Sequence, residues 1–201
     1  MSNRPKIKQI NKIDFLQPQK QMLTNGIPMY VINGCSENVS RIDFIFEAGV
    51  WQQKKPLIAY FTNQMLKEGY EKFSSAQIAE RLDFYGSWLE LSLSYHHSFI
   101  TLYSLNKYLP QTLALLEQMI KKSTFPENEF KTILNTKKQN YLVDSEKVNV
   151  LANRKFNTCL YGEKHPYGKI ATLSDYDTLK IDSLKEFYRT HYSSKKCTIV
   201  F

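Results

Sequence analysis

Cysteine, glycine and long apolar runs are all scarce in this sequence of 201 residues. Its three cysteines, Cys35, Cys159 and Cys197, form neither a disulfide framework nor a CxxC metal clip, so we expect mostly buried thiols in a reducing compartment. No apolar run approaches the roughly 18 residues of a membrane span, and no apolar stretch follows the basic N-terminus to make a signal peptide. We therefore expect no membrane partner and a cytoplasmic location; a periplasmic protein whose signal peptide had been removed would look the same.

Motifs that signal a particular chemistry are also missing. The seven glycines form no phosphate-binding loop, and no G-x-S-x-G nucleophile elbow is present. No two of the four histidines are four residues apart, as a helical zinc motif requires. His96 and His97 are expected on or beside a strand, pointing to opposite faces, which prevents a shared metal ion. His165 precedes Pro166 and is expected in a turn, with its ring in a local hydrogen bond.

Positive charge is concentrated at one end of the chain. The net charge is +8, and half of this excess lies within residues 1–20, so residues 1–12 are interpreted as a basic tail. Neither a basic helix followed by heptads, nor zinc-finger spacing, nor an RNP-type aromatic strand is present. The sequence therefore predicts a solvated basic surface and no nucleic-acid partner.

Paired strands alternate with helices along the chain. Asn25-Gly26 between two apolar stretches predicts a hairpin within residues 22–32, and Ser74 with Gln77 predicts a capping box. Further strands are expected at 41–48, 88–94, 97–105 and 197–201, and helices at 57–67, 74–84, 109–121, 127–142, 146–159, 174–179 and 181–191. This order predicts an α+β fold over residues 1–201, with one mostly antiparallel sheet and helices packed on one face.

The helix expected at 57–67 carries the most informative pattern. The run Leu57-Ile-Ala-Tyr-Phe-Thr-Asn-Gln-Met-Leu-Lys-Glu-Gly69 resembles the zinc-site helix of the insulinase and mitochondrial-processing-peptidase family. The family pattern is Gly-x-Ala-His-Phe-x-Glu-His-Met-Leu, followed shortly by Gly. Five residues match it position by position: Ala59, Phe61, Met65, Leu66 and Gly69.

The residues that carry the chemistry of this pattern differ. In active members the two His bind zinc and the Glu is the general base, but here these positions hold Tyr60, Asn63 and Gln64. A further Glu ligand, roughly 75 residues downstream in the family, falls on Asn140. One phenol and three amides supply neither the imidazoles nor the negative charge of a zinc site. The resemblance therefore implies no catalytic residue and no cofactor in this chain, with zinc only in a partner subunit.

Other segments extend the resemblance over the whole chain. They are the Asn25-Gly26 hairpin, the strand ending Phe46-Glu-Ala-Gly-Val50, the run Tyr161-Gly-x-x-His-Pro-Tyr-Gly168, and Phe187-Tyr188 before the final strand. The family's peptide-docking edge strand, Leu-Asn-Ala-Tyr/Phe-Thr, falls near residues 89–93, where only the Leu is kept. The resemblance therefore does not imply that a peptide docks on this strand in the family's usual register.

The resemblance implies an architectural role. Family members contain two such domains in tandem, so a second, homologous domain is expected after residue 201. Some bacterial members, like the mitochondrial enzyme, pair a zinc-bearing subunit with one that has lost the motif. We therefore expect a zinc-less subunit that forms half of a peptide chamber with a zinc-bearing partner and contacts peptide substrates. The polar face of Tyr60, Asn63 and Gln64 is expected to line a cleft or meet a partner.

One alternative is a stand-alone peptide-binding or assembly scaffold without a peptidase partner, comparable to the core subunits of the respiratory bc1 complex. A gene for a zinc-bearing relative beside this one would favour the chamber subunit, and its absence would favour the scaffold. Another is an active hydrolase with a relocated site, for which no set of acid, base and nucleophile stands out.

Overall fold

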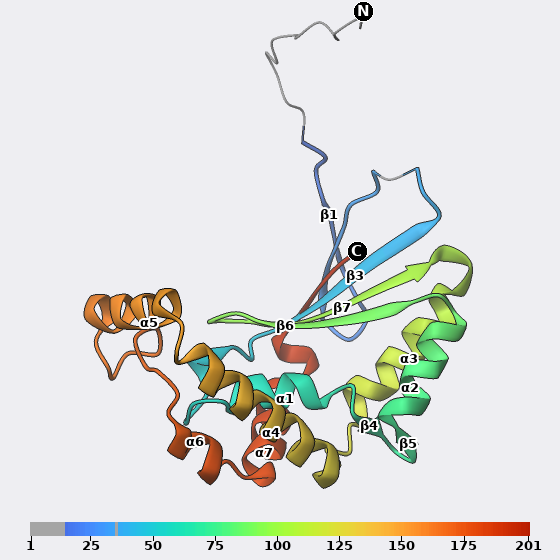
Figure 1. Cartoon of the computed structure of the whole chain (residues 1–201). Coiled ribbons are helices and arrows are strands. Elements are labelled where there is room, and N and C mark those ends of the chain that lie inside the picture. The colour runs from blue at the N-terminus through green and yellow to red at the C-terminus, as the bar shows by residue number, and fades with distance from the viewer. Residues whose placement is uncertain (1–14, 35) are drawn as a thin grey trace, which may run out of the picture.

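The chain folds around a six-stranded sheet in the computed structural model, which describes residues 15–34 and 36–201. The predicted basic tail at 1–12 and Cys35 lie outside the described residues. In spatial order the strands are β1 (Gln19–Met22), β2 (Pro28–Val31), β8 (Cys197–Val200), β3 (Val39–Phe46), β7 (Ser98–Leu105) and β6 (Trp88–Leu93). Neighbouring strands are antiparallel except β2 and β8, which run parallel. Strand β8 thus lies between β2 and β3 although it is the last in sequence (Figure 1).

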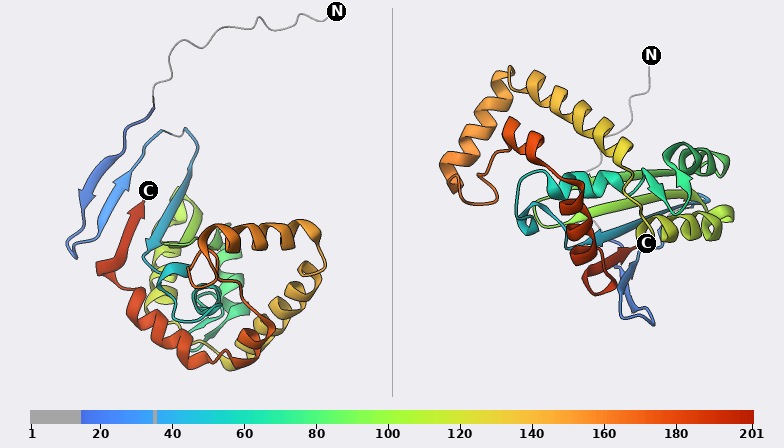
Figure 2. Two further views of the ribbon diagram at one scale, coloured as in Figure 1. Left: turned by 90° about the vertical axis from the view of Figure 1, so that its left-hand side faces the viewer. Right: turned by 90° about the horizontal axis from the view of Figure 1, so that it is seen from below.

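The helices lie on one face of this sheet (Figures 1 and 2). In the described part of the chain they are α1 (Ile58–Met65), α2 (Ser75–Phe84), α3 (Leu109–Lys121), α4 (Glu127–Asp144), α5 (Val148–Tyr161), α6 (Leu173–Thr178) and α7 (Ile181–His191). Three short 3-10 turns, Val50–Gln52, Asn106–Tyr108 and Ser194–Lys196, and a small hairpin of β4 (Gly69–Tyr70) and β5 (Phe73–Ser74) complete the list. The predicted α+β fold is therefore confirmed. The small hairpin was not predicted, because two-residue strands are too short to show a hydrophobic period.

Local signals in the sequence form the predicted turn and cap. Gly26 has φ +82°, which a glycine adopts without steric cost, and the Asn25 side chain accepts a hydrogen bond from the Ile27 amide. The Ser74 hydroxyl accepts from the Gln77 amide while the Gln77 side chain accepts from the Ser74 amide, closing the capping box that starts α2. Both predictions are confirmed.

Helix α1 is buried on two sides. Ala59 of α1 and Leu66, directly after the helix, belong to the core between helices and sheet, together with Ile100 and Leu102 of β7. The other side of α1 joins a second cluster that consists of Phe61, Met65, Phe125, Phe130, Tyr176 and Leu184, contributed by α1, α4, α6, α7 and the segment before α4. Because both faces are covered, the buried polar groups of α1, Thr62 and Asn63, must find their partners inside the protein.

Gly69 follows α1 where the chain passes close to the start of α4. A Cβ at this position would lie 2.9 Å from Cγ of Pro126 and 3.0 Å from Oγ1 of Thr124. The Gly that ends the family pattern is therefore required here by close packing.

The cysteines differ in part from expectation. Burial raises the pKa of the Cys197 thiol to about 12, in line with the predicted buried thiol. Cys159 is exposed on α5, so the prediction of burial is wrong there, because α5 has no layer packed over it. None of the described helices has both the length and the apolar character needed to span a membrane.

Candidate functional site

Helix α1 carries three of the four positions that the resemblance assigns to zinc ligands and base: Tyr60, Asn63 and Gln64. It packs against β6 and β7 on the sheet, against α7, and against α4, which carries the fourth position, Asn140. The candidate site therefore lies where one central helix meets the edge of the sheet and a second helix.

Asn63, at the position of the base, is wholly buried. Its side-chain nitrogen donates to the Ser98 hydroxyl at 2.7 Å and to the Phe99 carbonyl at 3.3 Å, both on β7. The Ser98 hydroxyl in turn hydrogen-bonds the Tyr192 hydroxyl at 2.6 Å, at the end of α7. The expectation that this residue lines a cleft is wrong, because β7 and α7 enclose it and satisfy its amide.

Gln64, at the position of the second His, extends this network to the edge of the sheet. Its side-chain nitrogen donates to Oδ1 of Asn63 at 3.1 Å and to the Leu91 carbonyl of β6 at 3.4 Å. The side chain is half-buried and its donors point at protein oxygens. An unbroken hydrogen-bonded chain thus runs from β6 through Gln64, Asn63 and Ser98 to Tyr192.

Tyr60, at the position of the first His, packs below a cation. Nζ of Lys137 on α4 lies 4.5 Å from the centre of its ring, and the ring also meets Phe61 edge-on at a centroid distance of 5.2 Å. This cation–π contact fastens α4 to α1. It also places a positive charge beside the position of a zinc ligand, where it would repel a metal cation.

Asn140 is separate from the other three positions. It lies on α4, one turn beyond Lys137, and its side chain is exposed. Within residues 15–34 and 36–201, no hydrogen bond joins it to Tyr60, Asn63 or Gln64. The structure therefore brings two of the four amide and phenol side chains into direct contact and leaves Asn140 on the surface.

The residues present do not fit zinc. The ion prefers thiolate, imidazole and carboxylate ligands, whereas these four positions offer a phenol and three amides. In the described part of the chain, no three His, Cys, Asp or Glu side chains gather to hold a metal ion. Burial raises the pKa of the Tyr192 phenol far above its usual value, so the one titratable group of the network stays neutral and supplies no base. The arrangement is suited to holding helices and strands together.

An aromatic cluster around the β6–β7 turn was not predicted. Trp51 lies edge-on to His165 and Tyr167, with centroid distances of 5.4 and 5.9 Å, and Nε2 of His96 lies 2.5 Å from the Tyr167 hydroxyl. Nδ1 of His165 accepts from the Tyr167 amide at 3.1 Å, which confirms the predicted local hydrogen bond. His96 and His97 lie in the turn itself. The members of the cluster come from three segments that are distant in the sequence, so no local pattern could predict their contact. The motif of residues 161–168 was the one signal in the sequence for part of this cluster.

The insulinase family, peptidase family M16, matches residues 31–166, which is more than half of the chain and includes α1 and the strands β3, β6 and β7. The chain belongs to the insulinase family. No curated protein matches it.

Solved structures share this insulinase-family fold at low sequence identity. A structure from Pseudomonas fluorescens described as a peptidase M16 inactive domain superposes with a TM-score of 0.87 at 23% identity. A protease from Helicobacter pylori gives 0.82 at 15%, and a structure from Alicyclobacillus acidocaldarius gives 0.79 at 12%. The matches cover 92%, 92% and 95% of this chain but 46%, 46% and 47% of the other chains. The chain thus spans about half the length of these structures.

Strand β6 of this insulinase-family domain forms one edge of the main sheet. It pairs with β7 along one side, and among the described residues no strand pairs with the other. Leu89, Leu91 and Leu93 are half-buried on one face, whereas Trp88 and Glu90 are exposed on the other. An unpaired strand edge offers backbone groups to which an extended peptide can add.

Proposed function

We propose that this chain is a zinc-less, non-catalytic domain of an insulinase-family peptidase, which forms half of a peptide chamber with a zinc-bearing partner subunit. One observation carries the proposal: the amide at the position of the catalytic base, Asn63, is wholly buried and bonded to Ser98 and Phe99. A side chain held in this way can neither activate water nor reach a metal ion.

The role that remains for the domain is architectural. Its residues supply a wall of the chamber, and the free edge of β6 offers backbone donors and acceptors to an extended peptide. The network from Gln64 to Tyr192 holds α1 rigidly behind that edge. The partner would supply the metal, the base and the chemical step, while this domain positions the peptide and excludes water.

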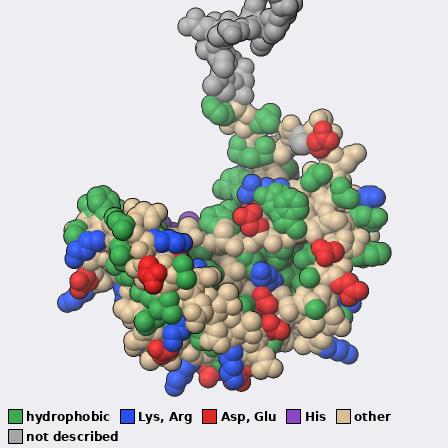
Figure 3. All heavy atoms as spheres, in the orientation of Figure 1, with side chains coloured by type: hydrophobic (Ala, Val, Ile, Leu, Met, Phe, Trp, Pro, Cys, Tyr) green, Lys and Arg blue, Asp and Glu red, His purple; other side chains and the backbone are tan. Residues whose placement is uncertain are grey.

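The surface of α5 supports association with another protein. This helix buries none of its side chains, and it displays Val148, which is 80% exposed, and Phe156, which is 64% exposed. Its other exposed apolar residues are Leu151, Leu160 and Tyr161. Figure 3 shows hydrophobic side chains gathered over this part of the molecule. An exposed apolar patch of this kind marks an interaction surface, and we assign it to the zinc-bearing subunit.

A stand-alone peptide-binding scaffold is the second candidate. The unpaired edge of β6 also favours it, because strand addition requires no peptidase partner. The two candidates differ in one measurable respect, which is whether zinc and cleavage accompany the protein in its native complex.

The test is affinity purification of the full-length protein from its native cell, with metal analysis and a peptide-cleavage assay on both the complex and this chain alone. Zinc and cleavage that occur only in a complex with a related subunit would support the chamber. A complex without zinc or cleavage would favour the scaffold. Zinc or cleavage by this chain alone would overturn the proposal that it is non-catalytic.

A further inference from the structure

A buried carboxylate lies in a cavity beside the start of β6. Glu68, three residues beyond the end of α1, is only 9% exposed. Within residues 15–34 and 36–201 its carboxylate accepts no hydrogen bond and forms no ion pair. Its oxygens open onto the cavity, where a group from outside the chain could pair with them.

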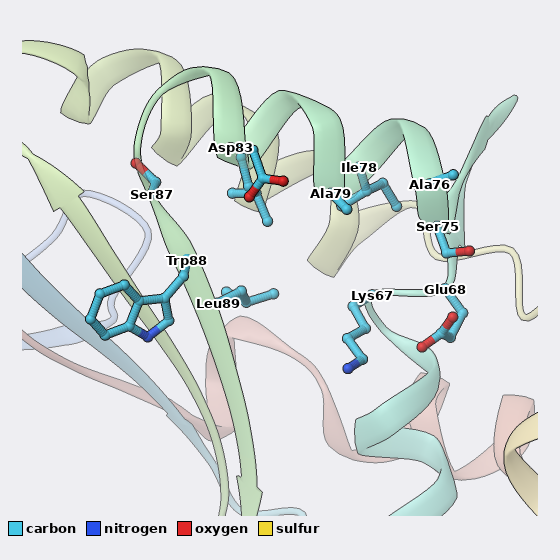
Figure 4. A pocket seen from close by; sticks show the side chains of 11 residues that line it. Lys67, Glu68, Ser75, Ala76, Ile78, Ala79, Asp83, Ser87, Trp88 and Leu89 are labelled. Carbon is cyan, nitrogen blue, oxygen red and sulfur yellow. The ribbon is translucent and has the colours of Figure 1, made fainter. Parts of the chain in front are cut away.

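The cavity that Glu68 lines measures about 440 Å³ and lies between the end of α1, helix α2 and strand β6 (Figure 4). Its apolar lining consists of Ala76, Ile78, Ala79, Leu82 and Leu89, and its polar lining adds Lys67, Ser75, Asp83 and Ser87 to Glu68. Leu89 points from β6 into the space, whereas the ring of Trp88 points away from Glu68. The cavity is therefore apolar along its sides and carries acidic groups.

The charges around this cavity favour a cation. Two lining residues, Glu68 and Asp83, are acidic, and Lys67 favours ionisation of Glu68 more strongly than Glu129 on α4 disfavours it. Lys67 is the single basic residue among those that line it, and it forms no ion pair with Glu68. Burial raises the pKa of Glu68, and a cation beside the carboxylate would relieve this cost.

We propose that this cavity is a binding pocket for a cationic side chain, lysine or arginine, of a peptide that lies along the edge of β6. The aliphatic stem would pack against Ile78, Leu82 and Leu89, and the charged head would pair with Glu68, while Asp83 at the other end of α2 would add to the negative potential of the cavity. The inference deepens the proposed function, and it rests on that proposal for the peptide nature of the ligand. It assigns to this domain a preference for basic peptides.

The test is direct binding to the purified chain, measured by fluorescence anisotropy with two labelled peptides. One is Ala-Ala-Arg-Ala-Ala-Ala, and the other replaces the arginine with citrulline, which has nearly the same shape and no charge. We expect the arginine peptide to bind about tenfold or more tightly to the unmodified chain, because a charge-assisted hydrogen bond is lost with citrulline.

Three variants make the test specific to this pocket. Glu68→Gln keeps the size of the side chain and should abolish the difference between the two peptides. Asp83→Asn should reduce the difference by a smaller factor, and Glu90→Gln, an exposed residue on the other face of β6, should leave it unchanged. Circular dichroism on each variant checks the fold.

Three outcomes would each overturn the proposed pocket. The unmodified chain could bind the two peptides equally, it could bind neither of them, or the preference for arginine could survive in Glu68→Gln. These outcomes are separate from those for the chamber. If the native complex contains zinc and cleaves peptides, but the chain binds both peptides equally, only the proposed pocket is wrong. If the chain prefers the arginine peptide, but no zinc-bearing partner is found, only the proposed chamber is wrong.

Discussion

The side-chain nitrogen of Asn63 donates a 2.7 Å hydrogen bond to the hydroxyl of Ser98, and this bond joins the central helix to the sheet. Asn63 occupies the position that the family pattern gives to the catalytic base. In this chain that position has become part of the interior framework, because the amide is wholly buried and Ser98 continues the contact to Tyr192.

Asn63→Asp should destabilise the protein at neutral pH. The substitution replaces a donor with a carboxylate that cannot donate to Ser98 or to the Phe99 carbonyl, and it buries a charge. We expect a loss of about 2–4 kcal/mol in the free energy of unfolding, measured by urea denaturation at pH 7. Because protonation removes the charge, part of the loss should be recovered at pH 5.

Asn140→Asp is the matched control, since it makes the same chemical change at the exposed position of the candidate site. Its effect should stay within about 0.5 kcal/mol. Equal effects of the two substitutions would contradict the burial of Asn63.

Glu68→Gln should make the chain more stable at neutral pH. Burial raises the pKa of Glu68 in the folded state above its value in the unfolded chain, with Glu129 acting in the same direction and Lys67 against it. The folded state therefore holds its proton more tightly, and wild-type stability decreases as the pH rises through the folded pKa. Removal of the charge should therefore raise the free energy of unfolding at pH 7 by up to about 1 kcal/mol, because the carboxylate still reaches solvent through the cavity, and should change it little at pH 4.

Thermal unfolding at several pH values measures this difference, with Glu90→Gln as the exposed control. If Glu68→Gln proved less stable than the wild type at pH 7, the carboxylate would have a stabilising partner that the structure lacks. The same substitution is expected to stabilise the chain and to weaken its binding of arginine peptides, a combination typical of residues kept for binding.

Zinc binding should return when the four altered positions are restored together. The variant is Tyr60→His, Asn63→Glu, Gln64→His and Asn140→Glu, which recreates the donor set of an active member. Isothermal titration calorimetry measures zinc affinity, and circular dichroism confirms that the variant is folded. A folded variant without zinc binding would show that these positions are wrongly aligned with the family's ligands.

Lys137 should weaken that restored site. Its ammonium lies over the Tyr60 ring, so it would repel a metal cation held by a histidine there. Adding Lys137→Gln to the fourfold variant should tighten zinc binding by about tenfold, which corresponds to about 1.4 kcal/mol. Lys131→Gln, six residues earlier on α4, serves as a control for the loss of one positive charge. The prediction fails if both substitutions change zinc affinity equally.

The apolar surface of α5 should be needed for association. Phe156→Ser combined with Leu160→Ser should reduce the amount of zinc-bearing subunit that co-purifies with the protein, because both side chains are exposed and apolar. The stability of the isolated chain should change little. Lys155→Ser, a polar change on the same helix, should leave the partner bound. Full retention of the partner by the double variant would exclude this surface from the interface.

Local patterns in the sequence predicted most elements of the fold, but not the small β4–β5 hairpin. The apolar spacing from Leu57 to Leu66 predicted α1, and Ser74 with Gln77 predicted the start of α2, because each signal lies within a few neighbouring residues. The match of residues 31–166 to the insulinase family confirms the predicted family. The assignment of the four altered positions to zinc ligands and base stays a prediction.

The environment of the site could not be predicted in the same way. Ser98 lies 35 residues beyond Asn63, and Tyr192 another 94 residues beyond Ser98, so no local pattern shows that they meet. The isolation of Glu68 likewise depends on how α1, α2 and β6 come together around it. Burial of a polar residue is a property of the packed fold, whereas periodicity reports only one element at a time.

The position of β8 in the sheet determines when the sheet can be completed during synthesis. Among the described strands, β2 pairs with β1 and β8 alone, and β3 meets the first hairpin only through β8. While a ribosome is still making the segment before Cys197, the nascent chain therefore has two separate sheets, β1–β2 and β3–β7–β6. The edges of β2 and β3 that face each other stay unpaired until β8 emerges. Unpaired strand edges are sites at which nascent chains aggregate. The domain should thus depend on chaperones most in the interval just before β8 leaves the exit tunnel.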